Sequence, residues 1–393
     1  MGRVRGLTGT RHTAILGPMT SNQPNTTHVT EDRSFRAFHA FMRASRSYME
    51  GPVYESAYRA YNHAVDANHA PANGAPSNAD EALDVLDGMP SYQLYGWMYR
   101  HLQRFKYRYA DWGLVPKVET ERETLEAELN AAAEASQKAG TLRLDPDIAY
   151  PDYYRLVDFH QHPGGVWSDD LDGVIYELGR RTTLPLHMDS NDLYRLMFSY
   201  LPQDRTYERV LDWGAGHGGM LLSWLETHPE CEAHGIDISA PCLKLANKRA
   251  REQGVTLHLS QQEIGALDYP DNHFDLVMFC FMLHEIPPKP TRPAFEEVYR
   301  VLKPGGLYAG IEFLPQKDHP FQNAMLLTSM WANNEPFAAA SFGYPYLDVA
   351  RKIGFSKAEI VPFDKLQQTQ PGTLDGEDGR PPFAFWPIYM FEK

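Results

Sequence analysis

The chain has 393 residues, of which 43% are hydrophobic and 22% charged, and its formal net charge is −14. This length suits two domains, or one large domain with an extension, and the composition is that of an ordinary globular protein. The acidic balance argues against a nucleic-acid binder, which usually has a basic face. The sequence contains no run of about 18 apolar residues, so no membrane span is predicted. It also lacks, near residue 1, the apolar segment typical of a signal peptide.

The cysteine pattern bears on the compartment. The three cysteines, Cys231, Cys242 and Cys280, form neither a metal-ligand spacing nor an even set for disulfides. We therefore expect a reducing, cytoplasmic setting and no metal ion. We expect no membrane partner and no nucleic-acid partner.

The first half of the chain predicts helices. Residues 1–30, rich in Thr, Asn, Gly and Arg, are expected to be a disordered lead. Gly51 and Pro52 are expected to end one helix before the next begins, and Gly140 to cap a charged, alanine-rich helix. Apolar spacing predicts the other helices over 35–49, 54–65 and 91–109. We interpret their many tyrosines as core or as the face of a homodimer, and expect residues 31–200 to form a helical cap, substrate or dimerisation region.

From residue 201 onward, short apolar runs alternate with helical segments. This alternation predicts an α/β fold, a doubly wound, Rossmann-like sheet, in the region 201–393. The last two runs have no clear helix between them, so we expect a hairpin across the loop 370–381 and an antiparallel last strand. Seven runs are expected to be strands: 210–213, 233–238, 255–259, 274–282, 307–313, 358–361 and 383–391.

A glycine-rich turn, "WGAGHGG", follows the first of these strands. Glycine permits left-handed backbone and close approach of a ligand, and the following helix offers unpaired N–H groups. Gly214, Gly216 and Gly219 fit the dinucleotide pattern G-x-G-x-x-G, which alone is a weak signal. These features predict a nucleotide-type cofactor.

Two carboxylates flank this turn. Asp212 precedes the first glycine, where a negative charge suits a ligand that carries an amino group or a sulfonium. Asp237 ends the second strand, where a carboxylate can accept hydrogen bonds from both ribose hydroxyls. The alternative for Asp237 is a helix N-cap, a role that Ser239 can take itself. The alternative for Asp212 is a simple turn residue.

Four segments together resemble the class I S-adenosylmethionine-dependent methyltransferases, in particular the small-molecule group that includes the ubiquinone/menaquinone methyltransferases. The segments are "VLDWGAGHGG", "GIDIS", "YPDNHFDLVMFCFMLHEIP" and "EEVYRVLKPGGLYAGIEF", and they span about half the chain. The resemblance implies S-adenosylmethionine as the cofactor. It puts Glu263, 12 positions before Asp275, where the family has an adenine-contacting acid, usually Asp; Gln262 is a rival. The implied cofactor-binding residues are Asp212, Gly214, Gly216, Gly218, Asp237, Ile238, Glu263, Ile264 and Cys280.

The candidates for catalysis lie at two strand exits. Methyl transfer from a sulfonium is an in-line displacement, and a base is needed only when the acceptor must lose a proton. His284 and Glu285 follow the fourth strand, where open α/β sheets bind ligands, and histidine titrates near neutral pH. Glu312, at the end of the fifth strand, is a further candidate.

The substrate-side candidates precede the sheet. The segment 150–170 has the aromatic and Gly-Gly content of a lid, although a polar linker is an equal alternative. Arg180 suits a carboxylate or phosphate on the acceptor, unless it is merely a solvated charge. The segment 321–337 is expected to form a partly apolar pocket wall. The lid candidates are Tyr153, Tyr154, His160 and His162.

These observations predict a methyltransferase that acts on a small molecule, with the methylated atom (O, N, S or C) left open. One alternative is a nicotinamide-dependent oxidoreductase built on the same glycine pattern. Asp212 and the "LKPGG" turn argue against it. The other alternative is a nucleotide-binding scaffold protein without turnover.

Overall fold

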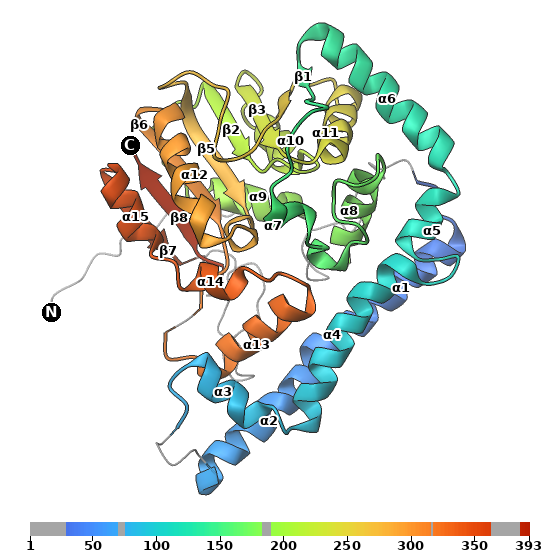
Figure 1. Cartoon of the computed structure of the whole chain (residues 1–393), viewed down its shortest axis with the longest axis vertical. Coiled ribbons are helices and arrows are strands. Elements are labelled where there is room, and N and C mark those ends of the chain that lie inside the picture. Colours follow the sequence, from blue (N-terminus) through green and yellow to red (C-terminus); the bar gives the residue numbers. More distant parts are fainter. Residues whose placement is uncertain (1–28, 70–74, 183–189, 316, 363–385) are drawn as a thin grey trace, which may run out of the picture.

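A computed structural model describes residues 29–69, 75–182, 190–315, 317–362 and 386–393. A twisted sheet has helices on both faces, and a group of long helices extends from one side of it (Figure 1). The expected disordered lead lies outside the described residues except at its end, and the loop 370–381 lies wholly outside them.

The sheet has eight described strands in the order β1-β4-β3-β2-β5-β6-β8-β7. All neighbours are parallel except β6 with β8 and β8 with β7, so the predicted hairpin and antiparallel last strand are confirmed. The prediction of seven strands is one short, because β1 is a two-residue strand at the edge. The bounds are β1 Leu142–Arg143, β2 Arg209–Trp213, β3 Glu232–Asp237, β4 His258–Gln261, β5 Phe274–Cys280, β6 Leu302–Ile311, β7 Lys357–Val361 and β8 Ile388–Glu392.

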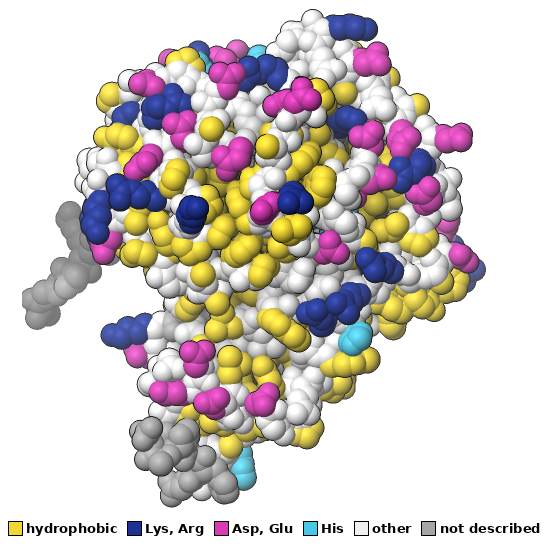
Figure 2. All heavy atoms as spheres, in the orientation of Figure 1, with side chains coloured by type: hydrophobic (Ala, Val, Ile, Leu, Met, Phe, Trp, Pro, Cys, Tyr) yellow, Lys and Arg dark blue, Asp and Glu magenta, His cyan; other side chains and the backbone are white. Residues whose placement is uncertain are grey.

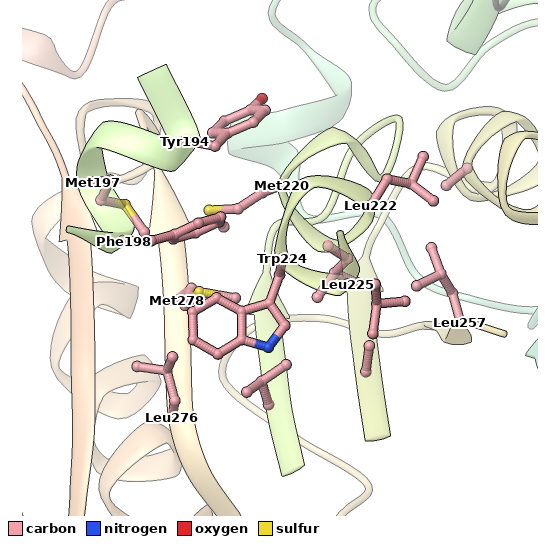
Figure 3. Close-up of a cluster of buried hydrophobic side chains, with 14 of the residues drawn as sticks. Tyr194, Met197, Phe198, Met220, Leu222, Trp224, Leu225, Leu257, Leu276 and Met278 are labelled. Carbon is pink, nitrogen blue, oxygen red and sulfur yellow. The ribbon is translucent and has the colours of Figure 1, made fainter. Parts of the chain in front are cut away.

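Side chains of the central strands alternate between two cores, as the period of two in a strand requires. Leu276 and Met278 of β5 pack against α9 and α10, whereas Val277 and Phe279 pack on the opposite face, against α12 and α15. Figure 3 shows the first core, where the Trp224 ring lies over β5. The helices of this part are α8 Asp172–Arg180, α9 Ser190–Phe198, α10 Gly219–Leu225, α11 Ala240–Glu252, α12 Pro288–Val301, α14 Ala338–Phe342 and α15 Tyr346–Ile353.

Two of the helices that precede β1 are joined where the sequence predicts a break. The expected break at Gly51 and Pro52 is wrong: a π-helical turn, η1 Met49–Val53, links α1 to α2 without interruption. The wider π turn accommodates the proline ring, which would clash with a carbonyl in a regular helix. Gly140 does cap α6, with φ +76°. The elements are α1 Arg33–Tyr48, α2 Tyr54–Ala64, η2 Val65–His69, α3 Ala79–Leu86, α4 Pro90–Arg108, α5 Leu114–Glu119 and α6 Arg122–Ala139.

A third core joins these helices to α13 Pro320–Ala332. Phe321 of α13 lies in a ring of tyrosines, with centroids 5.4 Å from Tyr54, 5.0 Å from Tyr58 and 5.1 Å from Tyr61. The interpretation of the tyrosines as core is confirmed for these residues. In Figure 1, α13 accordingly lies between the sheet and the helices α3 and α4.

Short elements complete the connection between the two halves. They are α7 Asp152–Arg155, the 3-10 turn η3 Phe159–Gln161 and, after β5, the 3-10 turn η4 Leu283–Glu285. Over the described ranges, no helix has the length and apolar content needed to cross a membrane.

Candidate active site

β2 and β5 are parallel neighbours at the point where the strand order switches, since β3 and β4 are added on one side of β2 whereas β5 and β6 are added on the other. Ligands of open α/β sheets bind at the carboxyl ends of the strands at such a point. The glycine turn, Asp212 and Cys280 all lie there, at the ends of β2 and β5.

The glycine turn has the conformation that its composition predicts. Gly214 and Gly216 have φ values of +89° and +49°, in the left-handed region. A Cβ on Gly214 would lie 2.5 Å from Sδ of Met282, whereas a Cβ on Gly216 would meet nothing within 4 Å. The turn is therefore closed at Gly214 and open at Gly216. Gly218, with φ +75°, packs against α11.

Asp237 is held beside the turn by two backbone donors. Its carboxylate accepts hydrogen bonds from the N–H of Gly216 (2.8 Å) and of Ser239 (2.8 Å). Burial raises the pKa of Asp237 to about 6, although these N–H groups favour the ionised form. Ser239 itself caps α11, through its side-chain oxygen, so Asp237 is not the N-cap residue.

Asp212 is only 2% exposed, and its Oδ1 has no hydrogen-bond partner among the described residues. Burial, reinforced by the charge of Asp237, raises the pKa of Asp212 well above its ordinary value. A buried carboxyl oxygen without a partner is costly, and a cationic ligand would satisfy it. Burial likewise raises the pKa of the Cys280 thiol, and the charge of Asp212 adds to this shift.

The candidates for adenine binding follow β4. Glu263 is half-buried and accepts hydrogen bonds from the N–H of Gly265 (2.7 Å) and the hydroxyl of Tyr153 (3.4 Å). Gln262 is buried, and its Nε2 lacks a partner among the described residues. Both remain candidates. Ile264 is half-buried against the second core, and the carbonyl of Ile238 accepts a hydrogen bond from Gln261 (3.0 Å).

A network of histidines and carboxylates lies at the ends of β5 and β6. Glu312 is fully buried and accepts hydrogen bonds from the N–H of Leu283 and from Nδ1 of His284 (2.7 Å). Burial alone would lower the pKa of His284, but the Glu312 charge outweighs it and raises this pKa to about 9. Nε2 of His284 faces Oε2 of Glu335 at 3.9 Å, which is too long for a hydrogen bond.

His160 extends the network toward Glu285. Its Nε2 lies 2.9 Å from Oε1 of Glu285, and its Nδ1 lies 3.1 Å from Oε1 of Glu335. These carboxylates overcome the effect of burial and raise the pKa of His160 to about 10. The backbone of His160 is left-handed, with φ +56°, a conformation that non-glycine residues adopt at a cost and often at functional sites.

Sequence reasoning missed Glu335 and Asn333, which complete this network. Asn333 donates to Oε1 of Glu335 and, in turn, accepts a hydrogen bond from Gln103 of α4. Both follow α13 in "WANNEPF", where three consecutive polar residues interrupt an otherwise apolar segment. That interruption is the sequence feature from which Asn333 and Glu335 could have been predicted. Across the described ranges, no set of three or more His, Cys, Asp or Glu residues is arranged to hold a metal ion.

Two substrate-side candidates, His162 and Arg180, lie apart from the network around His284 in the contacts described. His162 is fully buried, with Nε2 3.0 Å from Asp172 and its ring against Tyr107, so it packs inward. Arg180 is not a solvated charge: its Nε donates to Glu177 at 2.9 Å, and its side chain is 14% exposed. Neither residue reaches the network around His284 in the contacts described.

Tyr153 contacts a cofactor candidate, and the ring of Tyr154 lies 6.2 Å from that of Tyr150. Tyr153 donates to Glu263, as described above. Burial raises the pKa of Tyr154 well above its usual range, with the charge of Asp237 as the next contribution. The segment is also tied to β4 through Gln261, which donates to the hydroxyl of Tyr150 (3.2 Å).

Residues 210–306 match the sequence model of a family described as "Methyltransferase domain". These residues include the glycine turn, Asp237 and His284. This segment of the chain is therefore similar to methyltransferase domains.

The chain is also similar to curated methyltransferases. The chain is 32% identical over 115 residues to a demethylmenaquinone methyltransferase of Thermus thermophilus, covering 29% of this chain and 51% of that protein. It is 35% identical over 107 residues to the ubiquinone/menaquinone biosynthesis C-methyltransferase UbiE of Neisseria meningitidis, covering 27% and 43%. The chain thus spans about half the length of the curated relatives that it matches.

Among solved structures, phosphoethanolamine N-methyltransferase 2 of Haemonchus contortus, in complex with S-adenosyl-L-methionine, is 18% identical, with a TM-score of 0.37. That similarity covers 51% of this chain and 52% of the other.

Proposed function

We propose that the chain is an S-adenosylmethionine-dependent methyltransferase that acts on a small molecule. The observation that carries the proposal is the pair Asp212 and Asp237 on either side of a left-handed glycine turn, within the segment that matches the methyltransferase family. The unpartnered oxygen of Asp212 fits a ligand with a positive charge, and the open side of Gly216 leaves room for it.

The residues of the turn would hold the cofactor as follows. Asp237 accepts hydrogen bonds from the ribose hydroxyls, Asp212 faces the cationic end, and Glu263 or Gln262 binds the adenine. When bound, S-adenosylmethionine supplies a methyl group on a sulfonium. The task of the chain is then to align the acceptor and to exclude water.

The acceptor site is proposed at the network of His284, Glu335 and His160. Glu312 fixes the ring of His284, so that Nε2 faces the gap of 3.9 Å toward Glu335. A neutral imidazole there takes a proton from the acceptor, and an imidazolium holds an ionised acceptor. Both roles require an acceptor with a dissociable proton, so we propose a hydroxyl or an acidic carbon as the methylated group.

The helical region 31–200 is proposed to cap this site, and residues 201–393 to form the cofactor-binding domain. The contact of Gln103 with Asn333 and that of His160 with Glu335 support the cap, because each joins the first half to the network. We further propose a cytoplasmic setting, supported by three free cysteines.

Calorimetric titration with S-adenosylmethionine, S-adenosylhomocysteine and NAD tests the cofactor. We expect binding of both sulfur nucleotides, loss of that binding in Asp237→Ala, and no heat with NAD. A transfer assay with radiolabelled methyl donor over phenols, enols and thioethers then tests the acceptor. Label on a thioether alone would contradict the acceptor class, and binding without any transfer would favour a scaffold protein.

A further inference from the structure

Several buried polar atoms near the glycine turn lack a hydrogen-bond partner among the described residues. Oδ1 of Asp212 and Nη1 of Arg180 are two of them, and Nε of Arg249, whose Nη1 donates to the carbonyl of His217, is another. Within the described residues, Arg180 forms an ion pair with Glu177 alone. A guanidinium N–H buried without an acceptor is as costly as the unpaired carboxyl oxygen, so each atom calls for a ligand group of the opposite charge.

Arg180 is anchored to the glycine turn through Glu177. Glu177 is 1% exposed, accepts a hydrogen bond from Nε of Arg180 (2.9 Å), and lies 3.4 Å from Nε2 of His217. His217 is itself part of the turn, between Gly216 and Gly218. The guanidinium of Arg180 is thus positioned from the first half of the chain against the turn that Asp212 precedes.

Positive charge exceeds negative charge around Glu177. Burial alone would raise the pKa of Glu177, but the nearby guanidinium groups of Arg180, Arg249 and Arg181 hold it well below its ordinary value. Arg181 has a second carboxylate partner, Glu31, at 3.1 Å. Arg180 has no second carboxylate in the part of the chain that is described, so one of its N–H donors remains for an anion.

Tyr194 of α9 packs against the glycine turn. A Cβ on Gly219 would lie 3.2 Å from Cε2 of Tyr194, so the tyrosine ring rests on the turn. Figure 3 shows Tyr194 on α9, next to Met220 of α10. Burial raises the pKa values of Tyr194 and Cys280, and the charges of Asp212 and Arg180 contribute to both shifts with opposite sign.

We propose that Arg180 and Asp212 form a clamp for the amino-acid end of S-adenosylmethionine. Nη1 of Arg180 donates to the carboxylate, Oδ1 of Asp212 accepts from the ammonium group, and Glu177 is a positioning residue that holds Arg180. This inference rests on the proposed function and deepens it. It assigns Arg180 to the cofactor rather than to the acceptor.

Decarboxylated S-adenosylmethionine is the sharpest probe, because it lacks only the carboxylate. Calorimetry on the natural chain is expected to show that S-adenosylmethionine binds about 10- to 100-fold more tightly than the decarboxylated form. Arg180→Gln is expected to abolish this preference and to leave the affinity for the decarboxylated form unchanged. Arg180→Lys keeps the positive charge but lacks the planar, forked set of N–H donors of a guanidinium, so it is expected to retain part of the preference.

Further ligands and variants separate binding from folding. 5′-Methylthioadenosine lacks both charged groups and is expected to bind equally to the natural chain, Arg180→Gln and Asp212→Asn. Asp212→Asn is expected to weaken both amine-bearing ligands. The control is Arg195→Gln on α9, where Arg195 pairs with Glu226 at the surface and all affinities should stay unchanged.

Three outcomes would overturn the clamp. The natural chain could bind both forms of the cofactor equally, Arg180→Gln could keep the preference, or the variant could lose 5′-methylthioadenosine as well, which would indicate a structural role. If the natural chain binds none of the three nucleotides, the proposed function fails, and the clamp fails with it.

Discussion

Gly214 and Gly216 lie two residues apart in one turn but differ in their surroundings. We predict that Gly214→Ala abolishes cofactor binding and lowers the free energy of unfolding by more than about 2 kcal/mol. The new Cβ would combine a left-handed backbone penalty with a contact of 2.5 Å to Met282. Gly216→Ala is the matched control, because it carries only the backbone penalty of about 1–2 kcal/mol. Urea denaturation measures the free energy of unfolding of both variants. Equal losses of this free energy in Gly214→Ala and Gly216→Ala would contradict the predicted difference between the two sites.

Asp237 illustrates a conflict between binding and stability. Its pKa of about 6 lies above the ordinary value, so the folded protein disfavours the ionised form, and the loss of stability develops as pH rises from about 4 through 6. We predict that Asp237→Asn raises the melting temperature of the cofactor-free protein at pH 7.5 while it weakens S-adenosylhomocysteine at least about tenfold. In the natural chain, affinity should decrease below pH 6. A variant that is less stable at pH 7.5 would refute this account.

His284 predicts the pH dependence of the reaction. With a pKa of about 9, only ~1% of the imidazole is neutral at pH 7. If it is the base, kcat should rise about tenfold per pH unit up to about pH 9, and His284→Gln should lower kcat about 100-fold or more and remove this rise. His63→Gln, at an exposed position of α2, is the control. A natural enzyme whose kcat is flat between pH 7 and 9 would exclude the role.

The glycine turn could be predicted because local geometry fixes it. Asp212 and the glycines lie in a single strand-turn-helix, so their spacing in the chain determines their spacing in the fold, and Asp237 meets them because β3 pairs with β2. Glu335 and Asn333 could not be predicted in the same way, because they meet His160 and His284 only after α13 has packed against α3 and α4.

At the scale of elements, α13 joins the helical region to the sheet. We predict that Phe321→Ala lowers the free energy of unfolding by about 3–5 kcal/mol, because the buried ring is surrounded by three tyrosines and its loss leaves a cavity. Leu156→Ala, at a side chain that is 68% exposed, should change it by less than about 0.5 kcal/mol. Chemical denaturation gives both values, and a small loss at Phe321 would mean that the two regions unfold separately.

The errors in predicted elements also have physical causes. Strands that contain four or more apolar residues, such as β5, are recognisable in the sequence as apolar runs. The two-residue strand β1 leaves none, since Leu142 and Arg143 join the sheet only by pairing with Leu259 and Ser260. Gly51 and Pro52 are usually helix breakers, and the contacts of η1 with its neighbouring helices override that tendency here.

At the scale of the whole molecule, we propose that a second copy binds the aromatic surface of α1 and α4. A groove of about 380 Å³ is lined by Phe38, Phe41, Phe105, Tyr109 and Trp112. Phe41 and Trp112 are 54% and 46% exposed, and Figure 2 shows hydrophobic side chains at this edge of the molecule. The proposal agrees with the interpretation of the helical region as a dimer face.

Light scattering tests this homodimer. We predict the mass of two chains for the natural protein and of one chain for Phe41→Asp, since a charge in the apolar interface is costly to bury. Leu156→Asp, at an exposed side chain elsewhere, should leave the mass unchanged. A natural chain that is monomeric at micromolar concentration would disprove the interface.

The two residues of β1 have a consequence for how the chain can be divided. They cover the outer side of β4, where the N–H of Leu259 donates to the carbonyl of Thr141 at 2.8 Å. A fragment that began at residue 201 would leave β4 as an open edge with unpaired backbone groups, which is a template for aggregation. The helical region therefore also shields the sheet from edge-to-edge association, so its removal would cost solubility as well as the side chains of His160 and Arg180.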